Sequence, residues 1–247
     1  MKKHADIMGM PVTIDVVDTD VRENDIEEIF SYFRKIDDQF SPYKKTSEVE
    51  RINSGGVPRD KYSSLMRKIL QLSEETKIDT EGFFDVYKKG RLDPSGVVKG
   101  FAIYEGAKKL STKGYNNFYV EIAGDIQTSG FNQERKKWRV GIRNPFDKEE
   151  IVKVVFLSGE GIATSGSYAR GAHIYNPKTQ KTVTDIASIT VISKTVYDAD
   201  RFATAAFAMG EKGIEFINKM MGTEGYMILK NKMAVYTEGF EKYTVME

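Results

Sequence analysis

Asp200 and Thr204 are four residues apart in the segment YDADRFATAAFAMG, residues 197–210. If a helix begins near Asp198 or Ala199, the two side chains share one face near the positive end of that helix. A carboxylate and a hydroxyl in this arrangement can bind a hard cation together with a phosphate group. The structural alternative is that Asp198 or Asp200 is an N-cap and that Thr204 is a packing residue.

A second candidate lies in DPSGVVKGFA, residues 93–102. Gly96 and Gly100 permit close approach of the backbone to a ligand, and Lys99 supplies a mobile cation. The segment is not a P-loop, because the Gly-Lys-Ser/Thr ending of that motif is missing. The alternative is a glycine-containing turn that only precedes a helix.

The third candidate is GIATSGSYARGAHIYNPKT, residues 161–179. A run of small and hydroxylated residues such as that around Ser165 can wrap an anionic ligand with its N–H and hydroxyl groups. His173 lies among these groups as a candidate catalyst, although a lone histidine is more often a structural residue. Neither Ser165 nor Ser167 lies in the Gly-x-Ser-x-Gly motif of a serine hydrolase.

Composition restricts the chemistry further. The chain of 247 residues has no cysteine and two histidines, which excludes disulfides, thiolate sites and zinc sites built on several imidazoles. Any metal is therefore a hard ion bound by oxygen, such as Mg²⁺, Ca²⁺ or Mn²⁺. A formal net charge of +1 gives no reason to expect nucleic-acid binding. The sequence shows no transmembrane-length apolar run and no signal peptide, so we expect a cytoplasmic protein unless a leader has been removed.

The elements that position these residues mix helices and strands without strict βαβ alternation. We therefore expect an α+β fold, with mixed or antiparallel sheets flanked by helices, in a single unit over residues 1–247 with two closely joined lobes. Residues 79–100 are expected to form a loop. The other expected elements are strands at 10–17, 118–122, 138–142, 152–157 and 186–192, helices at 25–40, 63–76, 101–110, 199–209 and 213–221, and a hairpin over 225–240.

Taken in order, these segments resemble the ApbE family, the FAD:protein FMN transferases. The resemblance covers about residues 8 to 210, and its most specific parts are ATSGSYARGAHI joined to ADRFATAAFAMG. The other matching motifs are Met8-Gly9-Met10, Ser41 with Tyr43, Ser47-Glu48 with Arg51 and Asn53, Thr80 with Gly82, Phe84 and Asp85, Asp93 with Gly96, Lys99 and Gly100, Ala123-Gly124-Asp125, Trp138–Ile142, and Ser188–Ile192.

The resemblance implies roles for individual residues. Asp200, Thr204 and the carbonyl of Gly96 would be Mg²⁺ ligands, and His173 would be the general base. The residues expected to contact FAD are Asp93, Lys99, Met8, Tyr43, Gly82, Phe83, Phe84 and Ile174. Asn176 and Gln180 depart from the aspartate and glycine that are usual in the family.

The implied reaction is Mg²⁺-dependent transfer of the FMN moiety of FAD to a threonine or serine hydroxyl of a target flavoprotein, with release of AMP. If water replaces that hydroxyl, the same site becomes an FAD pyrophosphatase. A non-catalytic flavin carrier is the alternative from a different functional class. The sequence does not identify the acceptor protein.

Overall fold

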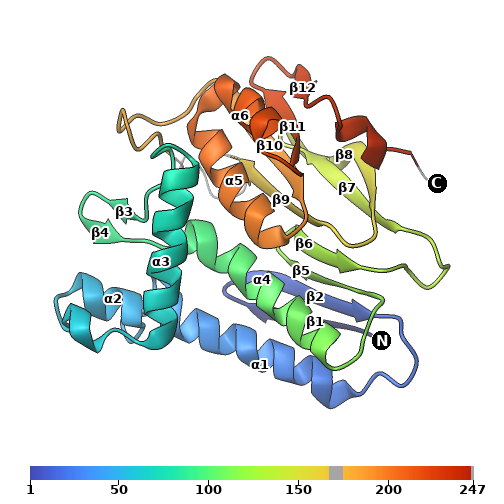
Figure 1. The fold of residues 1–247 in the computed structure, drawn as a ribbon, viewed down its shortest axis with the longest axis horizontal. Helices are drawn as coiled ribbons and strands as arrows, with labels where there is room; N and C mark the ends of the chain where they lie inside the picture. Colours follow the sequence, from blue (N-terminus) through green and yellow to red (C-terminus); the bar gives the residue numbers. More distant parts are fainter. Residues whose placement is uncertain (167–174, 246–247) are drawn as a thin grey trace.

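The computed structural model describes residues 1–166 and 175–245. Its centre is an eight-stranded sheet in the order β1-β2-β5-β6-β9-β10-β11-β12, in which each pair of neighbours is antiparallel (Figure 1). The fold is α+β, as predicted, and the antiparallel form of the sheet is the one observed. Its strands are β1 Lys2–Ile7, β2 Met10–Val16, β5 Phe118–Ile122, β6 Asp125–Ser129, β9 Gly161–Gly166, β10 Ile186–Ser193, β11 Glu224–Leu229 and β12 Ala234–Tyr236.

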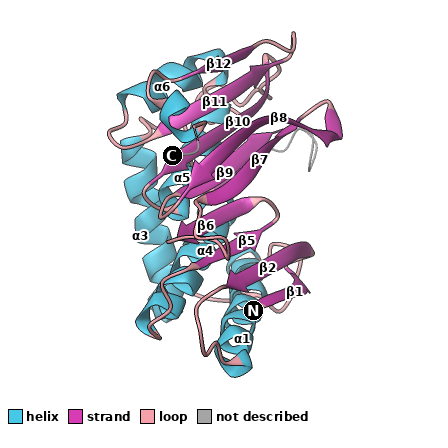
Figure 2. Cartoon of the chain, turned by 90° about the vertical axis from the view of Figure 1, so that its right-hand side faces the viewer, coloured by secondary structure: helices cyan, strands magenta, loops and turns pink. Residues whose placement is uncertain are grey.

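Helices lie on one side of this sheet, and a two-stranded hairpin lies on the other (Figure 2). The hairpin consists of β7 Trp138–Asn144 and β8 Asp147–Leu157, and a smaller hairpin pairs β3 Tyr87–Lys88 with β4 Arg91–Leu92. No helix in the described residues has both the length and the apolar character needed to cross a bilayer. The helices are α1 Glu23–Phe40, α2 Glu48–Asn53, α3 Ser64–Asp79, α4 Ser95–Thr112, α5 Val196–Ala208 and α6 Gly213–Lys219, with 3₁₀ turns at Arg59–Lys61, Gly210–Lys212 and Phe240–Tyr243.

The sheet is covered on both faces at its centre, which explains why β10 is buried along its whole length. Side chains alternate between the two faces of a strand. In β9, Ala163 packs in the cluster that contains Phe202 and Phe207 of α5. The neighbouring Ile162 packs with Val155 of β8 on the opposite face. Helix α5 therefore lies directly against β9 and β10, so the residues of these elements form one rigid layer.

Some of the expected elements differ from the structure near the candidate residues. Helix α4 begins at Ser95 rather than at residue 101, so Gly96, Lys99 and Gly100 are helical and not part of a loop. Glycine lowers helix propensity, which is why the sequence pattern placed the start too late. Helix α5 begins at Val196, before the expected start, and strand β9 at Gly161–Gly166 was not among the expected elements.

The pKa of Asp25 in α1 predicts how the stability of the fold depends on pH. Hydrogen bonds from Tyr115 and Lys113 lower the pKa of this carboxyl from 3.8 to about 2. Because the pKa is lower in the folded state, the ionised carboxylate stabilises the fold above pH 3.8, and this contribution is lost as the pH falls toward 2. In urea unfolding, we expect Asp25→Asn to be destabilised at about pH 6 and to approach the wild type below about pH 3. If the difference in unfolding free energy between Asp25→Asn and the wild type did not change with pH, the lowered pKa of Asp25 would be contradicted.

Candidate functional site

The first turn of α5 is fixed by two polar residues outside the expected motif. Thr195 is the N-cap, and its Oγ1 accepts a hydrogen bond from the Asp198 N–H at 3.0 Å and donates one to Asp198 Oδ2 at 2.7 Å. Gln127 Oε1, on β6, accepts from the Val196 N–H at 2.8 Å. These contacts satisfy N–H groups that a helix end leaves unpaired. Asp200 therefore lies beyond the first turn of α5, and the N-cap is Thr195 rather than Asp198 or Asp200.

Helices α4 and α5 meet through two glycines on one face of α4. A Cβ atom on Gly100 would lie 2.7 Å from Asp200 Cβ and 2.9 Å from the Val196 carbonyl oxygen. A Cβ atom on Gly96 would lie 3.3 Å from Thr204 Cγ2. Residues four apart share a helix face, so the pair on α4 lies opposite the pair on α5. The structure therefore brings together the two segments that the sequence singled out for metal and phosphate chemistry.

Asp200 is 4% exposed and points into this junction. Its Oδ2 accepts a hydrogen bond from the Gly100 N–H at 2.8 Å. Its Oδ1 lies 3.8 Å from the Lys99 ammonium, which also forms an ion pair with Asp125 Oδ2. A buried carboxylate needs such partners, because desolvation without compensation is costly. Lys99, predicted as a ligand-binding cation, is thus held between two carboxylates.

Asp125 is the charged residue of this site to which the sequence analysis gave no role. Ala123 and Gly124 have φ angles of 52° and 91°, and Ile122 pairs with Asp125 across them. Positive φ at both central residues is typical of a tight type I′ hairpin turn, which explains the Ala-Gly-Asp motif. The turn makes Asp125 the first residue of β6. Its Oδ1 accepts a hydrogen bond from the Thr164 N–H of β9 at 3.1 Å.

Hydroxyl groups complete the polar surface beside Asp200. Thr204 Oγ1 lies 3.5 Å from Ser165 Oγ, which extends from β9. The adjacent Thr164 points to the opposite face of β9, where its Oγ1 lies 2.8 Å from Thr190 Oγ1 of β10. Ser165 belongs to the run expected to contact an anion, and the structure places it on strand β9. A strand fixes its hydroxyl more firmly against Thr204 than a loop would.

The donor set fits magnesium better than it fits calcium or zinc. Within the described residues, no group of three or more His, Cys, Asp or Glu side chains is arranged to hold a metal. What is present is the buried Asp200 carboxylate, facing the glycine side of α4 near the Thr204 and Ser165 hydroxyls, and a second buried carboxylate, Asp125, which is paired with Lys99. Mg²⁺ is commonly bound by one or two carboxylates and completed by water and substrate phosphates. Asp200, Thr204 and the Gly96 carbonyl are therefore suitable ligands for a magnesium ion that a phosphate shares.

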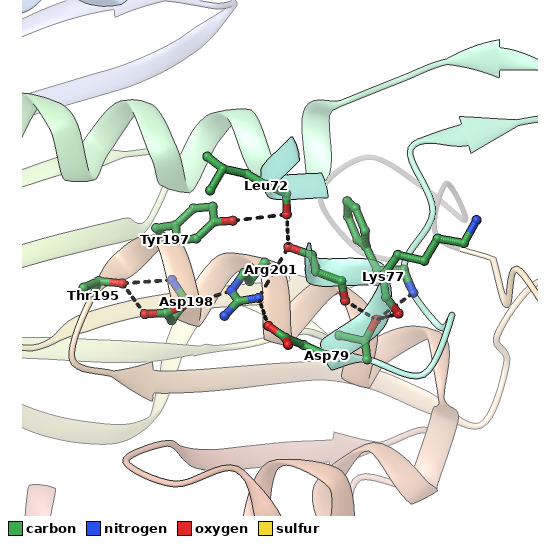
Figure 3. A network of polar contacts seen from close by, with 10 residues as sticks. Leu72, Lys77, Asp79, Thr195, Tyr197, Asp198 and Arg201 are labelled. Carbon is green, nitrogen blue, oxygen red and sulfur yellow. Dashed lines mark hydrogen bonds and ion pairs between the residues drawn. The ribbon is translucent and has the colours of Figure 1, made fainter. Parts of the chain in front are cut away.

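Arg201 ties this part of α5 to α3 (Figure 3). Its guanidinium forms ion pairs with Asp79 at 2.6 Å and with Asp198 at 2.9 Å. Its centre lies 4.1 Å from the centroid of the Phe202 ring. Tyr197 adds a hydrogen bond of 3.4 Å to the Leu72 carbonyl oxygen of α3. Because these contacts flank Asp200 in the sequence, they hold its turn of α5 against the end of α3.

The segment after α3 reaches the same junction. Thr80 Oγ1 accepts a hydrogen bond from the Phe84 N–H at 3.2 Å, and Phe84 is 4% exposed. A Cβ atom on Gly96 would lie 2.9 Å from the Phe84 ring, so this ring contacts α4 at the candidate ligand. Phe83 instead lies under the Lys178 ammonium, 4.0 Å from its ring centroid. A Cβ atom on Gly82 would lie 3.8 Å from Lys178 Cε.

Other predicted residues have different surroundings in the structure. Asp93 Oδ1 accepts from the Ser95 N–H at 3.1 Å, which supports the start of α4. Met8 has a φ angle of 60° in the β1–β2 turn and packs on the main core. The Tyr43 side chain is 88% exposed, in the segment between α1 and α2. His173 and Ile174 lie outside the described residues.

Comparison with known proteins adds to this geometry. The model of the ApbE family matches residues 8–89 and 87–227, which is most of the chain. The chain belongs to the ApbE family. Both halves of the α4–α5 junction fall within the matched residues, so the family resemblance seen in the motifs is confirmed.

Solved structures of ApbE proteins share the fold. The ApbE protein from Thermotoga maritima has a TM-score of 0.87 at 20% identity, covering 99% of this chain and 99% of that chain. Flavin transferase ApbE from Vibrio cholerae has a TM-score of 0.84 at 22% identity, covering 98% of this chain and 99% of that chain. These likenesses support the α+β architecture over the whole chain.

Curated relatives match over part of their length. The FAD:protein FMN transferase of Klebsiella pneumoniae is 32% identical over 162 residues, which are 62% of this chain and 45% of that protein. The protein of the same name from Haemophilus influenzae is 34% identical over 157 residues, 59% of this chain and 42% of that protein. The aligned part thus spans less than half of each of these relatives.

Proposed function

We propose that this protein transfers the FMN moiety of FAD to a threonine or serine hydroxyl of an acceptor protein and releases AMP. The observation that carries the proposal is the α4–α5 junction, where Asp200 and Thr204 face Gly96 and Gly100 beside the Lys99 ammonium. The name of the curated relatives, FAD:protein FMN transferase, supplies the substrate and the type of acceptor.

The protein's own groups suit a pyrophosphate substrate. Asp200 and Thr204 present a carboxylate and a hydroxyl one helical turn apart, and the Gly100 N–H fixes the orientation of the carboxylate. Magnesium bound here would neutralise negative charge on the phosphates during cleavage. The Lys99 ammonium adds positive charge within 3.8 Å of the same carboxylate. Preorganised charges of this kind stabilise a transition state because they need no rearrangement during the reaction.

The test is a single incubation with three readouts. The protein is mixed with FAD, Mg²⁺ and a candidate acceptor that carries a threonine or serine target site, and AMP release is followed over time. Mass spectrometry of the acceptor then detects an FMN adduct on the target residue. AMP together with the adduct supports the transferase. AMP with free FMN and no adduct indicates an FAD pyrophosphatase, and FAD binding without AMP indicates a flavin carrier.

We also propose that His173 is the general base that takes the proton from the acceptor hydroxyl. A general base contributes about 10²- to 10⁴-fold to a rate. His173→Ala should therefore lower the rate of flavin transfer by about 10²-fold or more. FAD binding, measured by equilibrium dialysis, should stay close to that of the wild type. An unchanged transfer rate would exclude His173 from this role.

A further inference from the structure

The Arg201 side chain joins α5, the helix that carries Asp200, to the last residue of α3 (Figure 3). This side chain is 12% exposed, and its Nη1 lies 2.6 Å from Asp79 Oδ2 while its Nε lies 2.9 Å from Asp198 Oδ1. Among the described residues, the backbone of α3 packs against α4 and barely approaches α5. The position of α3 relative to α5 therefore depends largely on side-chain contacts such as the Arg201–Asp79 ion pair.

Residues 80–85, which follow α3, are bound back onto the end of that helix. The Gly82 N–H donates a hydrogen bond to the Lys77 carbonyl oxygen at 2.7 Å, and the Thr80 hydroxyl donates to a carbonyl oxygen one turn earlier in α3 at 2.7 Å. The Lys77 ammonium forms an ion pair with Asp85 at 2.8 Å. Because both ends of the segment are attached to α3, residues 80–85 follow the orientation of its last turn.

The Phe84 ring brings this segment to the candidate metal site. A Cβ atom on Gly96 would lie 2.9 Å from that ring and 3.3 Å from Thr204 Cγ2. Gly96 is thus within contact range of both the 80–85 segment and α5. Residues 82–84 are predicted to contact FAD, whereas α5 carries two of the predicted metal ligands. The placement of α3 relative to α5 therefore sets the spacing between these two halves of the site.

We propose that Arg201 is a positioning residue whose ion pair with Asp79 holds the predicted FAD-binding segment, residues 80–85, at the correct spacing from the metal-binding turn of α5. With the pair intact, the spacing is set before FAD arrives. Without it, FAD has to order the segment as it binds, and the cost of this ordering weakens binding. This inference rests on the proposed function, because it requires FAD to occupy the site.

A general contribution of Asp79 to folding predicts a different result. The Asp79 side chain is 42% exposed, and an ion pair with this much exposure contributes little to stability. Asp79→Asn removes the charge and keeps the shape of the side chain, and Arg201 retains Asp198 as a partner. The variant should therefore fold with nearly wild-type stability. A loss of FAD affinity without a loss of unfolding free energy indicates a role in positioning.

The experiment compares FAD binding with metal binding in the full chain. FAD binding is measured by equilibrium dialysis in the presence of EDTA, which prevents metal-dependent cleavage, and Mn²⁺ binding is measured without flavin by electron paramagnetic resonance, as a probe of the magnesium site. Asp79→Asn should weaken FAD binding about threefold to fivefold, the effect of a partly exposed ion pair. Its Mn²⁺ affinity and its unfolding free energy in urea should match the wild type. In an Arg201→Met background, Asp79→Asn should have no further effect on FAD binding, because the pair is already broken.

Glu27→Gln is the matched control. Glu27 forms an ion pair of the same length, 2.6 Å, with Arg34 of the same helix, α1, and this variant should keep the wild-type FAD affinity. Wild-type FAD affinity in Asp79→Asn, or the same loss of affinity in the Arg201→Met background, would overturn the inference alone. A fall in Mn²⁺ affinity would also overturn it, because the pair would then hold the metal ligands and not the FAD-binding segment. If the wild type bound no FAD, the proposed function would fail together with the inference.

Discussion

Asp200→Asn should reduce Mg²⁺-dependent AMP release from FAD below detection while leaving the protein folded. Asn keeps an oxygen that can accept the Gly100 N–H, so the hydrogen bond of 2.8 Å that orients this side chain is retained. What is lost is the negative charge beside Thr204, and a neutral amide is a much poorer ligand for Mg²⁺ than a carboxylate. The variant should therefore separate the metal function of Asp200 from its packing. AMP release is measured by chromatography over a range of Mg²⁺ concentrations.

Asp198→Asn is the control for this prediction, because it removes a carboxylate two residues earlier on the same helix. Asp198 belongs to the N-terminal cap of α5 and forms an ion pair with Arg201 at 2.9 Å. We expect it to lose about 0.5–2 kcal/mol of stability and to retain AMP release. If Asp200→Asn retained full AMP release, the metal assignment would be wrong.

The pairing of Asp200 with Thr204 was predictable because helix geometry is local. A spacing of four residues in a helical segment places two side chains on one face in any tertiary context. The structure confirms this arrangement, although α5 begins at Val196 rather than near Asp198. The cap that sets this start is also visible in the sequence, as Thr195 followed three residues later by Asp198. A search for capping residues would thus have found the correct boundary.

The long-range part of the site was not predictable from residue types. Nothing local indicates that Asp125 pairs with Lys99, because the two residues are joined only when β6 packs beside α4. The available signals were the Ala-Gly turn and the period of two that places Asp125 and Gln127 on one face of a strand. Both indicate a hairpin that presents polar groups in one direction. Neither indicates which element receives them.

Helix α4 shows a different limit of structure prediction from sequence. Gly96 and Gly100 made residues 93–100 look like a loop, since glycine is unfavourable inside a helix. In the structure they are the positions where α4 has no side chain, which allows α5 to approach. Tertiary packing therefore overrides local propensity at the place where the site forms. The same two glycines also supported the ligand-binding interpretation, which stays a prediction, whereas the expected loop was wrong.

Gly100→Ala adds one methyl group to α4, and we expect it to disrupt the site more than a methyl group added at any other position of this helix. Alanine is the better helix former by about 1 kcal/mol, so local propensity alone predicts stabilisation. The added Cβ would lie 2.7 Å from Asp200 Cβ and 2.9 Å from the Val196 carbonyl oxygen, and a backbone atom of a packed helix cannot move aside cheaply. We expect a loss of about 1–3 kcal/mol in the free energy of unfolding. AMP release should fall with it, because α5 moves away from Gly96.

Gly106→Ala on the same helix distinguishes this effect from general crowding. There the added Cβ would lie 2.7 Å from the Phe33 ring and 3.1 Å from Ile29 Cγ2, both on α1. Gly106→Ala should lower the free energy of unfolding by a similar amount and leave Mn²⁺ affinity unchanged, whereas Gly100→Ala should lower both. Equal Mn²⁺ affinities in the two variants, measured at a temperature where both are folded, would contradict the role of the α4–α5 contact. The distance between two helix backbones at Gly100 would then not determine whether Asp200, Thr204 and Gly96 can bind one ion.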